Sequence, residues 1–212
     1  MAKFPNSPGA EALSKLAPAL HTLAAGTALA RVYYSRGPYP QSWNQLRHFG
    51  PLNSRWDHHV PDHGGGPYAQ QRGIYYAAAD AKTCLAEVFQ ETRRIDRVFQ
   101  APWLVVLETR SPVALLDLTG DFATRMGASM AIHSGHRGRA RAWARDLYEA
   151  FPEAEGILYA ASMAGGAPAM ALNERCGNAF FPVHPLLHRA LADDALLDPL
   201  KHAARALGYA LR

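Results

Sequence analysis

Short runs of β-branched and aromatic residues predict most of a β-sheet. Such residues favour strands because their side chains pack well on a pleated surface. The run 74–76, which follows a glycine, is the clearest example. The strands expected on this basis cover residues 28–34, 74–76, 103–108, 113–118, 156–161, 169–174 and 178–183. A short turn, 109–112, joins two of these runs, so we expect 103–108 and 113–118 to be neighbouring strands.

Apolar residues at helical spacing predict the helices. Around Cys84, apolar positions recur at i, i+3, i+4, i+7 and i+8, and Asp80 lies where a helix N-cap is expected. The other expected helices cover residues 7–25, 136–151 and 186–212. Proline interrupts the first of these at Pro18 and the last at Asp198-Pro199.

Residues 37–72 form the longest stretch without either pattern. The stretch is rich in glycine, proline, asparagine, aspartate and histidine, which predicts a long loop. Long loops in a compact domain are usually functional or disordered, so binding residues are expected within it.

Length and composition are those of a single domain. The chain has 212 residues, 49% hydrophobic and 19% charged, which suffices for one well-filled core. No run approaches the ~18 apolar residues of a membrane span, and the N-terminal residues show no secretory signal, so we expect a cytoplasmic protein. Cys84 and Cys176 form no metal-binding or disulfide pattern. A net charge of +4 argues against dense nucleic-acid coating and allows an anionic ligand.

Glu87 lies on the flank of the central predicted helix. At about 100° per residue it is roughly 60° from Cys84, at the edge of the apolar stripe. A carboxylate at this position is held by the buried face and can still reach a cleft. Most glutamates on helix flanks are simply solvated, so the position alone assigns no function.

A stripe of arginines in the predicted helix 136–151 offers a different function. Arg137, Arg141 and Arg145 recur at i, i+4 and i+8, which fits a nucleic-acid-binding face or a solvated basic face. No aromatic residues alternate with them, and this favours the solvated face.

A cluster of histidines and aspartates in the predicted loop offers a third possible function, metal binding. Asp57, His58, His59, Asp62 and His63 are potential metal ligands, as in a metal-dependent hydrolase. The segment lacks the paired spacing of a zinc site, and no predicted helix holds its ligands. A metal site is therefore the weaker interpretation.

One ordered set of short motifs resembles the RES domain family, which is named for its Arg, Glu and Ser. The matching residues, in family order, are Arg31, Arg55-Trp56, Tyr76, Glu87 and Ser162. Residues 182–185, Pro-Val-His-Pro, are similar to the Pro-x-His-Pro ending of the family core. Asp57 departs from the family asparagine, and Ala161 takes the place of a proline beside the serine.

This resemblance implies an α+β fold like that of ADP-ribosyltransferases. Two mixed β-sheets would face each other across a cleft within a single domain, flanked by helices. The catalytic domain would span residues 28–185. An N-terminal helical extension would cover residues 1–27, and C-terminal helices over 186–212 would pack on the same domain.

The resemblance also implies site residues. Glu87 would stabilise the positive charge that develops on the ribose as the nicotinamide–ribose bond breaks. Ser162 would donate a hydrogen bond to the substrate or orient Glu87. Tyr76 would stack on nicotinamide or orient the ribose. The implied catalytic residues are Arg31, Tyr76, Glu87 and Ser162. The residues implied to bind NAD are Arg31, Arg55, Trp56 and Tyr76. The two arginines would bind the diphosphate of NAD.

Members of the RES family degrade NAD, commonly as the toxin half of bacterial toxin–antitoxin pairs. The resemblance implies an enzyme with NAD as its substrate and no metal or other cofactor. The acceptor stays open: water gives glycohydrolysis, inorganic phosphate gives phosphorolysis, and a protein side chain gives ADP-ribosylation. A helix-turn-helix antitoxin is the implied partner, so this chain itself would bind neither DNA nor membrane. Whether it is a monomer or a homodimer also stays open.

Overall fold

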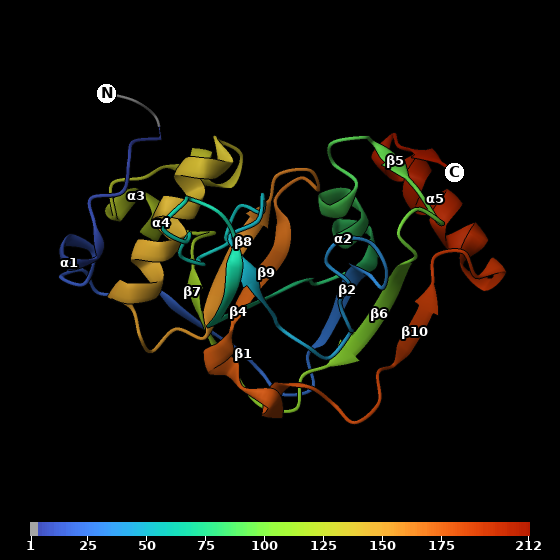
Figure 1. Ribbon diagram of the computed structural model, residues 1–212, viewed down its shortest axis with the longest axis horizontal. Coiled ribbons are helices and arrows are strands. Elements are labelled where there is room, and N and C mark those ends of the chain that lie inside the picture. The colour runs from blue at the N-terminus through green and yellow to red at the C-terminus, as the bar shows by residue number, and fades with distance from the viewer. Residues whose placement is uncertain (1–3) are drawn as a thin grey trace.

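The computed structural model describes residues 4–212 and shows a mixed α/β domain built on one large sheet (Figure 1). Its strands are β1 (Leu20–Leu23), β2 (Ala28–Tyr34), β3 (Arg47–Gly50), β4 (Tyr68–Ala78), β6 (Pro102–Glu108), β7 (Val113–Asp117), β8 (Gly156–Ala161), β9 (Ala167–Asn173) and β10 (Leu187–Ala190). The order is β1-β7-β8-β9-β4-β2-β6-β10, with β3 also paired to β4. Only β7 and β8 run parallel within the described sheet. β5 (Arg94–Ile95) and β11 (Ala210–Leu211) form a separate parallel pair.

The large sheet has two parts that meet at one residue pair. β2 and β4 are in register only at Ala30 and Ala78. By contrast, β2 pairs along its whole length with β6, and β4 pairs with β9 and β3. In Figure 1 the two parts diverge from this contact. A mixed sheet in two parts with helices around it agrees with the predicted fold class.

Helices flank both parts of the sheet. They are α1 (Ala10–Leu13), α2 (Ala81–Val88), α3 (Phe122–Arg125), α4 (Arg137–Ala150) and α5 (Leu197–Leu207). Figure 1 shows α1, α3 and α4 beside β7 and β8, and α2 and α5 beside β2, β6 and β10. Within residues 4–212, no helix has the length and apolar character needed to cross a membrane.

Both faces of the sheet are buried. Successive strand residues point to opposite faces, so Ile74 packs in one core cluster and Tyr75 in another. Leu116 and Leu115 separate in the same way. Burial on both faces explains why several strands read as continuous apolar runs rather than as alternating ones.

The central helix α2 begins where its sequence predicts. Asp80 accepts hydrogen bonds from the Thr83 amide at 2.8 Å and from the Thr83 hydroxyl at 2.9 Å, which confirms the predicted N-cap. Cys84 Sγ donates to the carbonyl of Ala30 at 2.9 Å. This bond ties α2 to β2 next to the point where the two parts of the sheet meet.

The helix predicted over residues 7–25 is wrong beyond its first turn. α1 ends at Leu13, and residues 20–23 form β1, which pairs with β7. Pro18 lies between them and cannot continue a helix, because its ring clashes with the preceding turn. The expected extension over 1–27 is therefore only partly helical, and its residues 1–3 lie outside the described part.

Two strand predictions are also wrong. β6 and β7 are not neighbours, because β6 lies between β2 and β10 while β7 lies between β1 and β8. A turn sequence shows that the chain changes direction but does not identify the strand that it meets. Residues 178–180 form a 3₁₀ helix instead of a strand, and it begins after Gly177, whose φ is 65°.

The polar stretch 37–72 contains strands that its composition hides. Residues 47–50 form β3, and β4 begins at Tyr68, several residues before the apolar run. The added strand positions carry arginine, histidine and glutamine, so the long-loop prediction is wrong for them. Backbone pairing with a neighbouring strand, not side-chain pattern, creates these segments.

The C-terminal region differs from the predicted pair of helices in two ways: it begins with a strand, and its helix is not interrupted at Asp198-Pro199. Residues 187–190 form β10, which pairs with β6. Asp198-Pro199 lies in the first turn of α5 and does not break it. Proline is tolerated there because a first-turn amide needs no intrahelical partner.

Candidate active site

A cavity of about 420 Å³ opens where β2 and β4 separate. Residues 31–34 of β2 line one wall, and Ile74 and Tyr76 of β4 line the other. The end of α2 and the segments 38–41 and 52–55 complete it, together with Gln100, Arg137 and Tyr159. The volume falls within the roughly 300–1,000 Å³ of small-molecule sites. β2 and β4 pair at Ala30 and Ala78 and then separate, and this separation creates the space for a ligand.

Arg31 is a buried cation with no carboxylate partner among residues 4–212. The residue is 4% exposed, and its guanidinium lies 4.0 Å from the centre of the Tyr75 ring. Nη2 donates to the neutral amide oxygen of Gln41, and Nε has no hydrogen-bond partner. Burial lowers the pKa of Arg31. Because an unpaired buried charge costs free energy, this position favours an anionic ligand.

Glu87 reaches the same cavity from α2. Its side chain is half-buried, and Oε1 accepts a hydrogen bond from the Met163 amide at 3.3 Å. Burial raises the pKa of Glu87, although the Met163 amide and the charges of Arg55 and Arg137 act in the opposite direction. A fixed and poorly solvated carboxylate interacts more strongly with positive charge than a solvated one does.

Two further arginines lie near Glu87. Arg55 donates to the carbonyls of Ile132 at 3.3 Å and Gly135 at 2.6 Å, which fixes it to the segment before α4. Arg137 forms an ion pair with Glu91, so α4 and α2 are linked beside the cavity. Burial and the neighbouring Arg137 lower the pKa of Arg55. This side of the cavity therefore also suits an anion.

Tyr76 lines the cavity, but its hydroxyl is buried behind the cavity surface. Burial raises the pKa of Tyr76, and the nearby charge of Asp57 acts in the same direction. The hydroxyl is buried and has no partner at hydrogen-bonding geometry, although Ser54 and the Trp56 backbone lie close enough to influence it.

A buried ion pair between Arg47 and Asp57 supports the wall opposite Arg31. Nη2 of Arg47 lies 2.7 Å from Asp57, which is fully buried. Asp57 also accepts from the Leu52 amide at 2.7 Å and from the His59 ring at 2.5 Å. Burial works against the charge of Asp57, but the His59 hydrogen bond and Arg47 outweigh it and lower the pKa of Asp57 to about 2. The residue that departs from the family asparagine is thus the centre of this network.

The other two implied site residues do not line the cavity. Trp56 is 1% exposed and packs 5.5 Å from Tyr159, ring centre to ring centre, so it supports a lining residue from behind. Ser162 is exposed at the end of β8. Its neighbour Met163 holds Glu87, so the turn after β8 reaches the site through its backbone.

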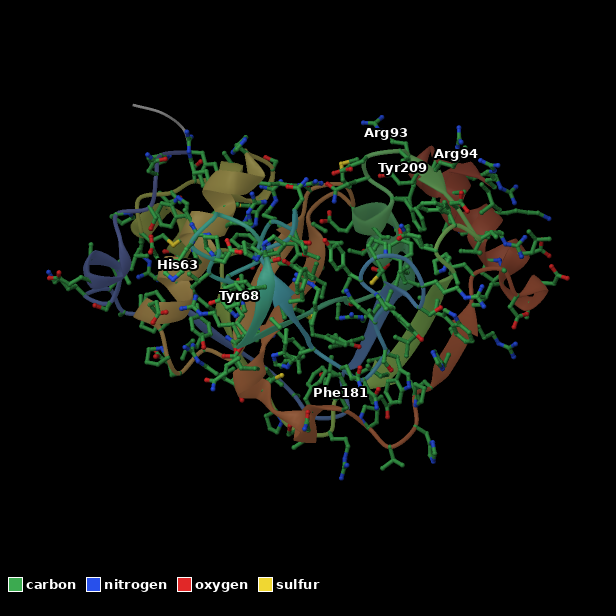
Figure 2. The ribbon with its side chains drawn as sticks, in the orientation of Figure 1. His63, Tyr68, Arg93, Arg94, Phe181 and Tyr209 are labelled. Atoms are coloured by element: carbon green, nitrogen blue, oxygen red, sulfur yellow. The ribbon has the colours of Figure 1, made fainter. Side chains whose placement is uncertain are left out.

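The histidines of the same segment are dispersed. His59 binds Asp57, His58 lies 3.6 Å from Glu174 and stacks on Tyr148, and His63 is exposed near the start of β4 (Figure 2). Residues 4–212 contain no group of three or more His, Cys, Asp or Glu side chains that could hold a metal ion.

The arginine stripe on α4 is not a free basic face. Arg137 pairs with Glu91, Arg141 donates to Asn53 at 3.1 Å, and Arg145 is half-buried. The stripe packs against the segment that contains Asn53 and Arg55. These contacts occupy donors that a phosphate backbone would need.

Three further cavity residues, Gln41, Arg47 and Tyr159, were not predicted from the sequence. All three line the cavity, and Gln41 and Arg47 come from the stretch predicted to be a loop. The run around Tyr159 predicts only a buried strand. No pattern within the chain distinguishes them, because their position depends on how β3 and the loops fold against β2 and β4.

Comparisons with known proteins place the chain in a family. The model of the RES domain matches residues 28–195. No curated protein matches the chain. The fold is similar to that of a chain in the crystal structure of the M. tuberculosis MbcT–MbcA toxin–antitoxin complex, with a TM-score of 0.56 and 15% sequence identity over 91% of this chain and 96% of that chain. Since the family model covers well over half of the sequence, this protein belongs to the RES domain family.

Proposed function

We propose that this protein cleaves the nicotinamide–ribose bond of NAD and acts as the toxin of a bacterial toxin–antitoxin pair. One observation carries the proposal: a single cavity contains the unpaired buried cation Arg31 and the half-buried carboxylate Glu87. The diphosphate of NAD complements the first, and a ribose that develops positive charge complements the second. Membership of the RES family supports this assignment, as does similarity in fold to a toxin–antitoxin chain.

The reaction breaks the bond between ribose C1′ and the nicotinamide nitrogen. The bonding electron pair leaves with nicotinamide and neutralises its pyridinium, while positive charge develops on C1′ and the ring oxygen. Glu87 stabilises that charge. Water then bonds to C1′ through its oxygen and releases a proton to solvent, whereas inorganic phosphate bonds through an oxygen that already carries negative charge. Transfer to a protein side chain follows the same course with a different acceptor.

The remaining residues bind and orient the substrate. Arg31 and Arg55 anchor the diphosphate, and the Tyr76 ring stacks on nicotinamide. Trp56 acts through the packing of Tyr159, and Ser162 acts through the turn that places the Met163 amide against Glu87. The diphosphate of the substrate supplies a counter-charge for Arg31, which has no carboxylate partner among residues 4–212.

The biological setting follows from the same proposal. NAD is the substrate, the protein acts in the cytoplasm, and a helix-turn-helix antitoxin restrains it by covering the cavity. DNA binding belongs to that partner.

Product analysis tests the function and identifies the acceptor. Purified protein is incubated with NAD in phosphate-free buffer and in phosphate buffer, and the products are identified by mass. Nicotinamide with ADP-ribose indicates hydrolysis, and nicotinamide with phosphorylated ADP-ribose indicates phosphorolysis. A mass increase on the protein or on an added target indicates ADP-ribosylation. Turnover should survive a chelator, whereas loss of turnover would favour a metal-dependent reaction. Absence of nicotinamide in every buffer would overturn the proposal.

Replacing Arg31 should weaken ligand binding. Arg31→Gln removes the charge that the substrate diphosphate would neutralise, so the affinity for ADP-ribose should fall about 10- to 100-fold, as expected for a lost charge-assisted hydrogen bond. Calorimetric titration with ADP-ribose measures the change. Arg110→Gln, at an exposed arginine between β6 and β7 that does not line the cavity, should bind like the wild type. Equal affinity in the two variants would remove Arg31 from the binding site.

The acid limb of the pH profile should report Glu87. The carboxylate must be ionised to act, and burial raises its pKa, so kcat/KM should fall on acidification at a pH above the usual range for glutamate. Arg137→Gln removes a charge that lowers this pKa, so the limb should move to higher pH. Initial rates measured between about pH 4 and pH 8 would show the shift. A limb that is unchanged in the variant would mean that another group titrates.

A further inference from the structure

The loop over residues 96–101 holds two apolar side chains in solvent beside the cavity. Val98 is 71% exposed and Phe99 is 65% exposed, the latter being the most exposed of the large aromatic side chains described. Gln100, the next residue, lines the cavity. Adjacent exposed apolar side chains mark interaction surfaces more often than single scattered ones do.

The loop holds this conformation through specific bonds. Asp96 Oδ1 accepts from the amides of Val98 at 2.9 Å and Phe99 at 2.8 Å. Arg97 Nε donates to the carbonyl of Leu191 at 2.8 Å. The backbone φ is 59° at Gln100 and 48° at Ala101. Residues other than glycine rarely adopt such positive φ angles. Such strain persists only where the surroundings enforce it, and it concentrates at binding sites.

Three exposed arginines lie on the chain segments that adjoin this loop. The Arg36 amide donates to the Gln100 carbonyl at 3.1 Å, which places Arg36 against the loop. Arg93 and Arg94 precede the loop and project outward from the edge at β5 (Figure 2). All three are exposed, and none forms an ion pair with a residue of the described part. The loop therefore carries an exposed apolar pair, and the segments that adjoin it carry arginines without an ion-pair partner in the described part.

We propose that Arg36, Arg93, Arg94, Val98 and Phe99 form a docking surface for an acidic polypeptide segment that also carries apolar side chains. Carboxylates of the segment pair with the arginines, and its apolar residues cover Val98 and Phe99. Aromatic residues and arginine are the types that contribute most to protein interfaces. Because Gln100 follows Phe99 directly and lines the cavity, a segment docked on Val98 and Phe99 lies beside the cavity. The surface is defined without reference to the reaction in that cavity.

Nucleic acid fits this surface less well. The exposed Val98 has no role in contacting a phosphate backbone, whereas it contributes directly to a peptide interface.

Peptide selection tests the proposal on the intact protein. A random-peptide phage library is selected on the wild type and depleted on an Arg94→Glu/Phe99→Ser variant. The expected consensus combines Asp or Glu with apolar residues. The consensus peptide, labelled for fluorescence anisotropy, should bind the variant about 10-fold or more weakly, with a marked dependence on salt. Both altered residues are exposed, so thermal melting should match the wild type and show that the variant folds.

Matched changes elsewhere serve as controls. Arg110→Glu/Val183→Ser alters an exposed arginine and a valine that is 71% exposed, near Phe181 on the opposite edge of the molecule (Figure 2). This variant should bind the consensus peptide like the wild type. Three results would overturn the proposal: no peptide that depends on the loop, a consensus without acidic residues, or a single-stranded oligonucleotide that binds with the same dependence. NAD turnover is measured in a separate assay. Failure of the docking proposal can therefore be told apart from failure of the proposed NAD-cleaving function.

Discussion

Glu87→Gln should reduce nicotinamide release from NAD by about 10²- to 10³-fold, the usual effect of removing one electrostatic contact to a transition state. Glutamine keeps the shape of the side chain, and its amide oxygen can still accept the Met163 hydrogen bond, so the change removes charge and little else. The lost interaction forms as the ribose becomes positive. The effect should therefore appear in kcat, with KM for NAD almost unchanged.

Single-turnover measurement of nicotinamide, with the protein in excess over NAD, checks this prediction without interference from product release. Glu153→Gln makes the same chemical change at an exposed position after α4 and should have wild-type activity. Glu87→Asp keeps the charge and moves it, so an intermediate rate is expected. If the glutamine variant retains turnover, the carboxylate has no part in the chemistry and the catalytic assignment fails.

Asp57→Asn should lower the free energy of unfolding by about 3–5 kcal/mol, because it leaves Arg47 as a buried charge without a carboxylate partner. The resemblance places an asparagine at this position in relatives, so the change looks conservative by sequence. In this chain it breaks the pair that fixes the cavity wall. Urea unfolding followed by tryptophan fluorescence measures the loss.

A double variant tests the physical reason. Arg47→Gln/Asp57→Asn removes both charges and should be destabilised by less than the sum of the single changes, since no uncompensated charge remains. Glu149→Gln breaks the ion pair with Arg72 at a carboxylate that is 53% exposed, and it should cost no more than about 1 kcal/mol. Equal losses for Asp57→Asn and Glu149→Gln would contradict a special role for the buried pair.

The same pair predicts how stability changes with acid. The pKa of Asp57 is about 2 in the folded protein and its ordinary value is 3.8. A lowered folded-state pKa stabilises the protein above the unfolded value, and this contribution is lost as pH falls from about 4 towards 2. Glu174 also has a pKa of about 2, so wild type and Asp57→Asn must be compared at each pH. The stability difference between them should shrink on acidification.

Local chemistry was sufficient to predict some elements. The N-cap at Asp80, the stripe around Cys84 and the buried face of α4 depend on spacing within a few residues, and the structure confirms them. The strands rich in β-branched or aromatic residues were predicted for the same reason. Prediction failed where pairing with a distant strand determines the structure. β3 carries polar residues and forms by pairing with β4, and β7 pairs with β1 and β8 instead of β6. Strand pairing joins distant parts of a chain, and no local pattern records it.

For the site, the sequence by itself determined which residue types are present and their order along the chain, from Arg31 to Ser162. Only the tertiary structure decided which of them meet. It brings Arg31, Arg55, Tyr76 and Glu87 to one cavity because β2 and β4 part after a single residue pair. It also sets Trp56 behind the wall, and it makes Asp57 the buried partner of Arg47. Burial and charge pairing depend on contacts between distant segments, and such contacts exist only in the folded chain.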